Sequence, residues 1–198
     1  NQKKITVVGA GIVGTCIAHE LSRLGQNVTI IDKSIPGSGT SGKSFNWVNA
    51  TYPKKPYSYN YLSQLGLGAF DDLYRYIDFP GKWNGSLEWF IDTKKHKELL
   101  DNVNQLLKYQ THSKHEIIDN LKASSFEPNI DFNKNNNIVY SVEDGAIDTL
   151  KTIENLVARI SFNGGKVINN CAYKNSIYRS GKLSSINTSL GEIETDII

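Results

Sequence analysis

Six residues near the start of the chain have the spacing of a dinucleotide-binding loop. They read Gly9-Ala10-Gly11-Ile12-Val13-Gly14 and follow an apolar, β-branched run over residues 5–8. The first glycine would allow a tight turn, the second the close approach of a pyrophosphate, and the third close packing of helix on strand. The helix that follows would present free N–H groups and a positive dipole to the phosphates. The chemistry indicated is the binding of a dinucleotide.

An acidic residue ends the second expected strand, at the place where a ribose would be recognised. Residues 13–24 have helical periodicity, and Gly25 is positioned to end that helix. We expect the buried face of the helix to be formed by Val13, Cys16, Ile17, Leu21 and Leu24. The strand 28–31 leads to Asp32, eighteen residues beyond Gly14, whose carboxylate can accept hydrogen bonds from a ribose diol. A glycine-rich turn in an ordinary α/β core would leave Asp32 unexplained.

A second glycine-rich segment matches the phosphate-binding P-loop pattern G-x-x-x-x-G-K-[ST]. It runs from Gly37 to Ser44. A P-loop needs a strand that leads directly into its first glycine and a helix that begins at the Lys-Ser pair. Here four residues, including Pro36, separate the expected strand from Gly37, and residues 45–53 are poor helix formers. The segment is therefore interpreted as a loop, at the surface or facing the cofactor, and a nucleoside triphosphatase is disfavoured.

Composition excludes several classes of partner. The 198 residues suffice for one sizeable core, and a formal net charge of +2 without a basic stripe argues against nucleic acid. No apolar run approaches membrane-spanning length and no signal peptide is evident, so no membrane span and a cytoplasmic location are expected. Cys16 and Cys171 fit a reducing compartment as small buried residues. Because the chain has no methionine, its first residue is not expected to be a native first codon.

Beyond Asp32 the sequence resembles the flavin-dependent oxidoreductases of the D-amino acid oxidase, glycine oxidase and sarcosine oxidase type, the DAO family. Gly39-Thr40-Ser41 followed by residues 43–47 is similar to the family loop G-x-x-[AT]-S and to the residues that run beneath the flavin. The family acid is usually Glu, of which Asp32 is a shorter version. The resemblance implies FAD as the cofactor. The expected ligands are Gly9, Gly11, Ile12, Val13, Gly14, Asp32, Lys33, Thr40, Ser41, Lys43, Ser44, Phe45, Asn46 and Tyr173.

Later segments carry the same resemblance. Residues 83–91, 124–128, 143–148 and 191–198 are similar to the family passages G-x-L-x-x-A, L-x-x-x-E-P, D-G-x-V-D-P and G-x-I-x-A-D-x-V. In the strand that begins at Val167, Tyr173 replaces the valine whose backbone touches the adenine in the family. The resemblance therefore extends over nearly all of the chain.

Helical periodicity predicts three further helices, over residues 61–77, 93–109 and 149–162. Asp148 would cap the last of them, so the acids of residues 143–148 are expected to be structural. His96, His112 and His115 lack the spacing of a helical metal pair, and no metal site is expected.

The fold implied is α/β with two parts. Residues 1–80 and 143–198 would form an FAD/NAD(P)-binding Rossmann-like domain, and residues 81–142 an inserted α+β portion of the substrate domain. Relative to the family the chain would be truncated at its C-terminus. We therefore expect a fragment, or one subunit whose partner chain supplies the missing half.

For the complete protein the resemblance implies the oxidation of a small amine or amino acid, with a hydride passing from the carbon that bears nitrogen to the flavin. No catalytic residue is assigned, because the substrate-binding Arg and Tyr of the family map mostly beyond this chain. Arg75 and the tyrosines between Tyr52 and Tyr61 are the visible candidates, and helix-surface or core roles are favoured for them. The alternatives are a non-catalytic dinucleotide-binding remnant or subunit, and an NAD-dependent dehydrogenase, which would continue strand–helix alternation after Asp32.

Overall fold

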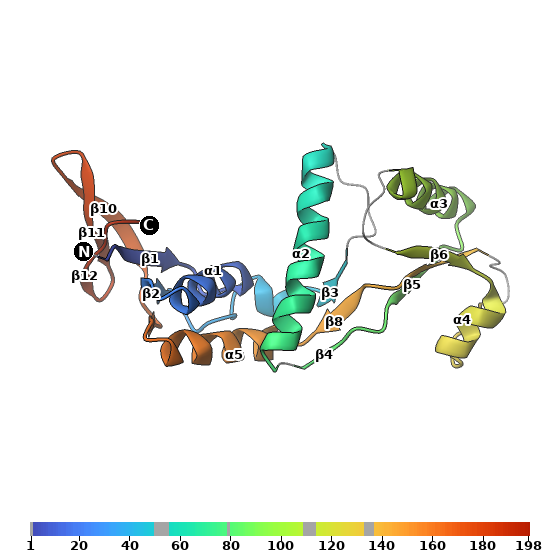
Figure 1. Ribbon diagram of the computed structural model, residues 1–198, viewed down its shortest axis with the longest axis horizontal. Helices are drawn as coiled ribbons and strands as arrows, with labels where there is room; N and C mark the ends of the chain where they lie inside the picture. The colour runs from blue at the N-terminus through green and yellow to red at the C-terminus, as the bar shows by residue number, and fades with distance from the viewer. Residues whose placement is uncertain (1, 50–55, 79, 109–113, 133–136) are drawn as a thin grey trace. The chain divides into compact units, whose positions relative to one another are not determined.

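The computed structural model describes residues 2–49, 56–78, 80–108, 114–132 and 137–198 (Figure 1). The chain divides into two compact units. The first unit comprises Asn1–Asn46, Ile77–Pro80 and Asp148–Ile198, and the second unit comprises Trp47–Tyr76 and Gly81–Ile147. The mixed α/β class expected from the sequence is confirmed.

A parallel sheet organises the first unit. Its strands are β1 (Lys4–Val8), β2 (Asn27–Ile31) and β9 (Lys166–Ile168), in the order β1-β2-β9. Parallel neighbours need a crossover connection, and α1 (Ile12–Arg23) supplies it between β1 and β2. On the other side of β1, the Thr6 N–H donates to the Ile197 carbonyl at 2.9 Å. The predicted strand–helix–strand crossover is confirmed.

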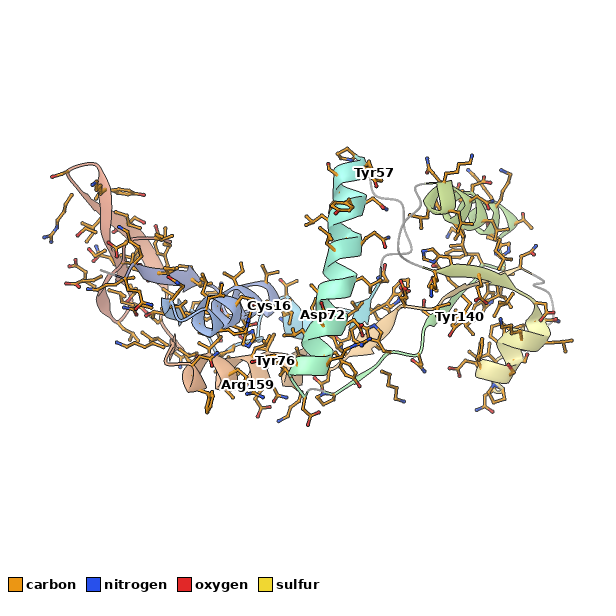
Figure 2. The ribbon with its side chains drawn as sticks, in the orientation of Figure 1. Cys16, Tyr57, Asp72, Tyr76, Tyr140 and Arg159 are labelled. Carbon is orange, nitrogen blue, oxygen red and sulfur yellow. The ribbon has the colours of Figure 1, made fainter. Side chains whose placement is uncertain are left out.

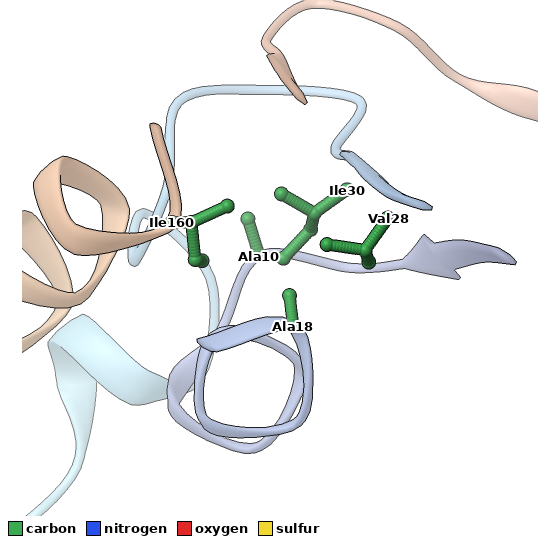
Figure 3. Close-up of a cluster of buried hydrophobic side chains, with 5 residues drawn as sticks. All are labelled: Ala10, Ala18, Val28, Ile30 and Ile160. Atoms are coloured by element: carbon green, nitrogen blue, oxygen red, sulfur yellow. The ribbon is translucent and has the colours of Figure 1, made fainter. Parts of the chain in front are cut away.

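The core between α1 and the sheet is built from small and β-branched side chains. Ala10, Ala18, Val28, Ile30 and Ile160 form one buried cluster (Figure 3). A Cβ on Gly14 would stand 1.8 Å from the carbonyl oxygen of Gly9, so helix and strand are in direct backbone contact. The face of α1 that meets the sheet must therefore carry short side chains.

The buried face predicted for α1 is wrong. The buried residues of the helix are Thr15, Ala18, His19 and Ser22. Val13, Ile17 and Leu24 are 69%, 49% and 62% exposed, while Cys16 and Leu21 are half-buried. Helical periodicity located the helix correctly but assigned its inner face to the larger apolar side chains. The close approach at Gly14 excludes them from the sheet side.

The helix α5 (Thr149–Phe162) covers the same sheet and has the predicted bounds. The Asp148 side chain accepts a hydrogen bond from the Lys151 N–H at 3.0 Å, as expected of an N-cap. Gly164, with φ of +87°, follows the helix end. The structural role predicted for Asp148 is confirmed.

An antiparallel sheet completes the first unit. It consists of β10 (Tyr173–Arg179), β11 (Lys182–Thr188) and β12 (Gly191–Glu194). Ser180 and Gly181 both have positive φ, the conformation of the two-residue hairpin turn that matches strand twist. Ile31, Cys171 and Ile186 form a buried cluster that joins this sheet to the parallel one.

In its described residues, the second unit has two small sheets and three helices. One sheet has the order β3 (Trp47–Val48), β8 (Gly145–Ile147), β4 (Gly81–Lys82). The other has the order β5 (Ser86–Glu88), β7 (Ile138–Ser141), β6 (His115–Ile118). The helices are α2 (Tyr57–Tyr76), α3 (Thr93–Lys108) and α4 (Asn120–Phe126). None of the helices in the described residues is long and apolar enough to span a lipid bilayer.

The compact units divide the chain differently from the boundaries expected from sequence. Residues 47–76 and 143–147 were expected with the dinucleotide-binding part, yet they belong to the second unit. The reason is strand pairing, because β8 pairs with both β3 and β4. Three segments far apart in sequence therefore form one sheet.

A buried carboxylate holds the second unit together. Asp144 is 1% exposed, and its Oδ2 accepts hydrogen bonds from the Trp47 indole N–H at 3.0 Å and the Ser86 hydroxyl at 2.7 Å. Its backbone carbonyl accepts from the Gly85 N–H at 3.0 Å. One side chain thus links the start of β3, the start of β5 and the turn before β8.

We predict that Asp144→Ala lowers the free energy of unfolding by about 2–4 kcal/mol, because two half-buried donors lose their shared buried acceptor. Asp144→Asn keeps one acceptor oxygen and should cost less. Urea unfolding followed by tryptophan fluorescence measures both. A loss below about 0.5 kcal/mol in Asp144→Ala would contradict this role.

The burial of His115 predicts that the folded protein is less stable in acid. His115 packs with its Nδ1 2.9 Å from the Ser141 hydroxyl, and burial holds the pKa of His115 below its usual value of 6.5. The unfolded chain therefore binds a proton more readily than the folded chain. The stability is fully present above pH 6.5 and falls as the pH drops below that value.

Accordingly, the melting temperature should fall between pH about 7.5 and about 5, and it should fall less in His115→Gln, which titrates no proton there. His19, whose pKa burial also lowers, remains in the variant and accounts for part of the residual fall. Identical pH profiles for the two proteins would rule out a contribution from His115.

Candidate cofactor-binding site

The turn between β1 and α1 has the geometry that its glycines indicate. Gly9 has φ of +103°, and its N–H donates to the Ile31 carbonyl at 2.8 Å. A Cβ at Gly14 has no room against the Gly9 carbonyl. The helix begins at Ile12; its N-cap residue, Gly11, has no side chain that could cap it, and no acidic residue lies in its first turn. The positive end of the helix dipole is therefore available to an anion.

Asp32, which follows the end of β2, is hydrogen-bonded to this turn. Its Oδ2 accepts a hydrogen bond from the Ala10 N–H at 2.7 Å, and its Oδ1 accepts from the Ser34 N–H at 2.8 Å. The half-buried carboxylate thus joins the turn after β1 to the turn after β2. Each carboxylate oxygen has a further lone pair, which leaves acceptor capacity for a ribose hydroxyl.

Ser41 reaches the same helix end from a loop twenty-nine residues away. It opens the short 3₁₀ helix η1 (Ser41–Lys43), and its Oγ accepts a hydrogen bond from the Ile12 N–H at 3.0 Å. A Cβ at Gly11 would lie 2.9 Å from this Oγ, so glycine is required for the contact. The hydroxyl stands where a phosphate oxygen would accept the same N–H.

The second glycine-rich segment packs against the first. The Gly37 N–H donates to the Ala10 carbonyl at 2.9 Å, and the Gly42 N–H donates to the Gly37 carbonyl at the same distance. A Cβ at Gly42 would lie 2.5 Å from the Gly37 carbonyl oxygen, and one at Gly37 would lie 2.9 Å from the Leu150 Cδ2 on α5. Both glycines therefore have packing roles that sequence reasoning missed.

The P-loop match does not have P-loop geometry. Lys43 ends a single 3₁₀ turn instead of opening an α-helix, and the short strand β3 follows. A P-loop lysine must sit at a helix N-terminus to reach the terminal phosphates. In the sequence, the packing role of Gly37 and Gly42 is indicated by nothing more than the repetition of glycine over residues 37–42.

The predicted ligands that follow Asp32 in the chain, apart from Ser41, have exposed side chains. Lys33, Thr40, Lys43, Ser44 and Phe45 are exposed, the last at 84%. Asn46 is also exposed, and its Oδ1 accepts from the Thr149 hydroxyl at 2.8 Å, which secures the end of the loop on α5.

Tyr173 opens β10 and is 40% exposed, with its hydroxyl 3.0 Å from the Ser176 hydroxyl. Two residues earlier, the Cys171 N–H donates to the Asp32 carbonyl at 2.7 Å. The Asn170 N–H donates to the Ser34 carbonyl at 3.3 Å, from a left-handed backbone with φ of 53°. These two contacts, which sequence reasoning missed, hold residues 170–171, just before Tyr173, at the end of β2.

The thiol nearest this helix end is not a nucleophile. Cys16 lies on α1 (Figure 2). Burial, and secondarily the charge of Glu20, raises the pKa of its thiol to about 11. The thiol therefore stays protonated at neutral pH. Among the described residues, no group of three or more His, Cys, Asp and Glu could hold a metal ion. His112 and Tyr52 lie outside the described residues.

Solved structures share this fold. L-proline dehydrogenase from P. horikoshii superposes with a TM-score of 0.84 at 20% identity, covering 100% of this chain and 52% of that one. Glycine oxidase from Bacillus cereus superposes with a TM-score of 0.83 at 15% identity, covering 99% of this chain and 54% of that one. This chain thus spans about half the length of each.

The sequence comparisons agree. Glycerol 3-phosphate dehydrogenase from Caloramator mitchellensis is 34% identical over 97 residues, which are 48% of this chain and 20% of that protein. The model of a protein family described as FAD dependent oxidoreductase, DAO, matches residues 4–198. FAD is the cofactor of that family. Because this match covers almost the whole length, the chain belongs to the DAO family of FAD-dependent oxidoreductases.

Proposed function

We propose that this chain binds FAD through the ligands expected from its sequence. The observation that carries the proposal is the convergence of Asp32 and Ser41 on the turn of residues 9–14. Asp32, at the end of β2, and Ser41, in the later loop, each accept a hydrogen bond from this turn or from the first residue of α1. A surface turn in an ordinary α/β core would not need either contact.

The roles proposed follow from the geometry. The pyrophosphate would lie at the N-terminus of α1, against the Val13 N–H, with one of its oxygens replacing the Ser41 hydroxyl as the acceptor of the Ile12 N–H. The Asp32 carboxylate would accept from the adenosine ribose. Gly9, Gly11 and Gly14 keep the backbone clear for this approach. The exposed side chains Lys33, Thr40, Lys43, Ser44, Phe45 and Asn46 would line the path of the cofactor, and Tyr173 would stand beside the adenine.

For the whole protein we propose the oxidation of a small amine or amino acid. FAD would supply the chemistry by accepting a hydride from the carbon that bears nitrogen. The residues of this chain would bind and orient the cofactor, and no catalytic residue is assigned among them. Arg75 is exposed and paired with Asp71 at 2.8 Å, which supports the helix-surface role expected for it.

The remaining half of the enzyme would come from further residues of a longer protein or from a partner chain. The support is that this chain spans about half of the solved structures that it matches. A cytoplasmic location also remains part of this proposal, supported by two cysteines that are free thiols.

Two alternatives differ in what they bind. An NAD-dependent dehydrogenase would bind NAD in preference to FAD, and a non-catalytic remnant would bind neither or would bind FAD without turnover. A visible absorption spectrum of the purified protein separates them, since bound flavin is yellow. Thermal shift with NAD, FAD and ATP extends the test, because a ligand of the native state raises the melting temperature.

We predict that Gly11→Val abolishes the thermal shift produced by FAD, because the new side chain collides with Ser41 and fills the approach to the pyrophosphate. Lys43→Ala removes one exposed charge and should only weaken the shift, by about tenfold or less in affinity. Binding of ATP that is lost in Lys43→Ala would instead favour the P-loop interpretation.

Asp32→Asn should disturb the turn even without cofactor. An amide keeps one acceptor oxygen but sets an NH₂ group against one of the two backbone donors. We expect hydrogen exchange at the Ala10 amide to quicken by about tenfold or more in the cofactor-free protein. Asp148→Asn, which alters a carboxylate cap elsewhere in the same unit, should leave the Ala10 amide unchanged. Unaltered exchange in Asp32→Asn would show that the hydrogen bonds of the Asp32 carboxylate are not needed to hold the turn.

A further inference from the structure

The hydroxyl of Thr149, the first residue of α5, holds the side chain of Asn46 at the end of the loop of residues 37–46. The Thr149 Oγ1 donates to the Asn46 Oδ1 at 2.8 Å, although the two residues are 103 positions apart in the chain. We propose that Thr149 is a positioning residue, which orients the Asn46 amide so that its NH₂ group donates a hydrogen bond to FAD. This inference rests on the proposed function, in which Asn46 is a ligand of the cofactor.

The direction of this hydrogen bond decides which end of the Asn46 amide is available to a ligand. An asparagine amide has an oxygen that accepts and a nitrogen that carries two donors. Because the oxygen is engaged by the Thr149 hydroxyl, the rotation of the amide group is fixed. The Asn46 side chain is exposed, and its nitrogen has no hydrogen-bond partner among the described residues. Both of its donors are therefore left for a ligand.

The first turn of α5 gives this contact a firm support. Thr149 is 7% exposed, and the residue before it caps the helix. The loop meets the same turn of the helix at two further points, since a Cβ at Gly37 would lie 2.9 Å from the Leu150 Cδ2 and a Cβ at Gly42 would lie 3.0 Å from it. A side chain held in this way loses little entropy when it binds a ligand.

The hydroxyl at position 149 is not needed to start the helix. Aligned from Asp144, the family passage D-G-x-V-D-P has its proline at the position of Thr149. Proline is favoured at the first position of a helix, and the extended backbone of Asp148, with φ of −80° and ψ of 99°, suits a following proline. Proline has no side-chain donor. What threonine adds at this position is the hydrogen bond to Asn46.

The first test uses the full chain without cofactor and follows the side-chain NH₂ signals of Asn46 by NMR. Thr149→Val keeps the shape of threonine without its hydroxyl and should lower the order parameter of this NH₂ group to below about 0.6, the range of flexible groups. Thr149→Ser should keep the group ordered. Thr152→Val is the control, because it removes a buried hydroxyl of α5 that donates to the Asp148 carbonyl at 2.7 Å, and it should leave Asn46 unchanged. An unaltered order parameter in Thr149→Val would refute the positioning role.

The second test measures the affinity of the same proteins for FAD by calorimetric titration. Thr149→Val should weaken FAD binding by about five- to tenfold, the effect expected of one hydrogen bond, whereas Thr149→Ser and Thr152→Val should bind FAD as the unaltered chain does. Thr149→Pro should keep the melting temperature and weaken FAD binding by the same factor as Thr149→Val. In a chain that carries Asn46→Ala, Thr149→Val should cause no further loss, because Thr149 acts through Asn46.

The outcomes separate this inference from the proposed function. Equal FAD affinity in Thr149→Val and the unaltered chain, or an additional loss when Thr149→Val is combined with Asn46→Ala, would overturn the positioning role. Absence of FAD binding by the unaltered chain would instead count against the proposed function, and the order parameter of the Asn46 NH₂ group would then decide the positioning role by itself.

Discussion

The first unit depends on the direct contact between the backbone of α1 and the backbone turn that follows β1. The Gly9 carbonyl lies where a Cβ of residue 14 would be, so no other residue type fits at position 14. Beside this contact the buried residues of α1 are Thr15, Ala18, His19 and Ser22, and the larger aliphatic side chains Val13 and Ile17 are exposed. The contact also aims the N-terminus of α1 at the carboxyl ends of β1 and β2, the edge at which α/β sheets bind their ligands.

A set of polar contacts keeps that edge in a defined shape. Asp32 holds the turns after both strands, and Ser41 brings a distant loop to the first N–H of α1. Glycines at 37 and 42 then let this loop lie close to α5. The resulting site is pre-organised, since the groups proposed to meet the ribose and the phosphates are already positioned by the protein. Pre-organisation lowers the entropy lost when a cofactor binds.

The second unit is built on a different principle. Its two sheets are short, and the buried carboxylate of Asp144 links β3, β5 and the turn before β8 through hydrogen bonds to Trp47 and Ser86. A polar centre of this kind is costly unless its hydrogen bonds are made, which ties the three segments to one arrangement.

The sequence by itself determined the crossover of residues 5–32, the helix from Thr149 with its Asp148 cap, and the family, because each depends on local spacing or on motifs read in order. Only the tertiary structure decided which face of α1 is buried, why Gly37 is a glycine, and which unit holds residues 47–76. The physical reason is that periodicity shows where a helix or strand forms, whereas burial and pairing depend on how closely distant backbones approach. That distance is set by partners far away in the chain.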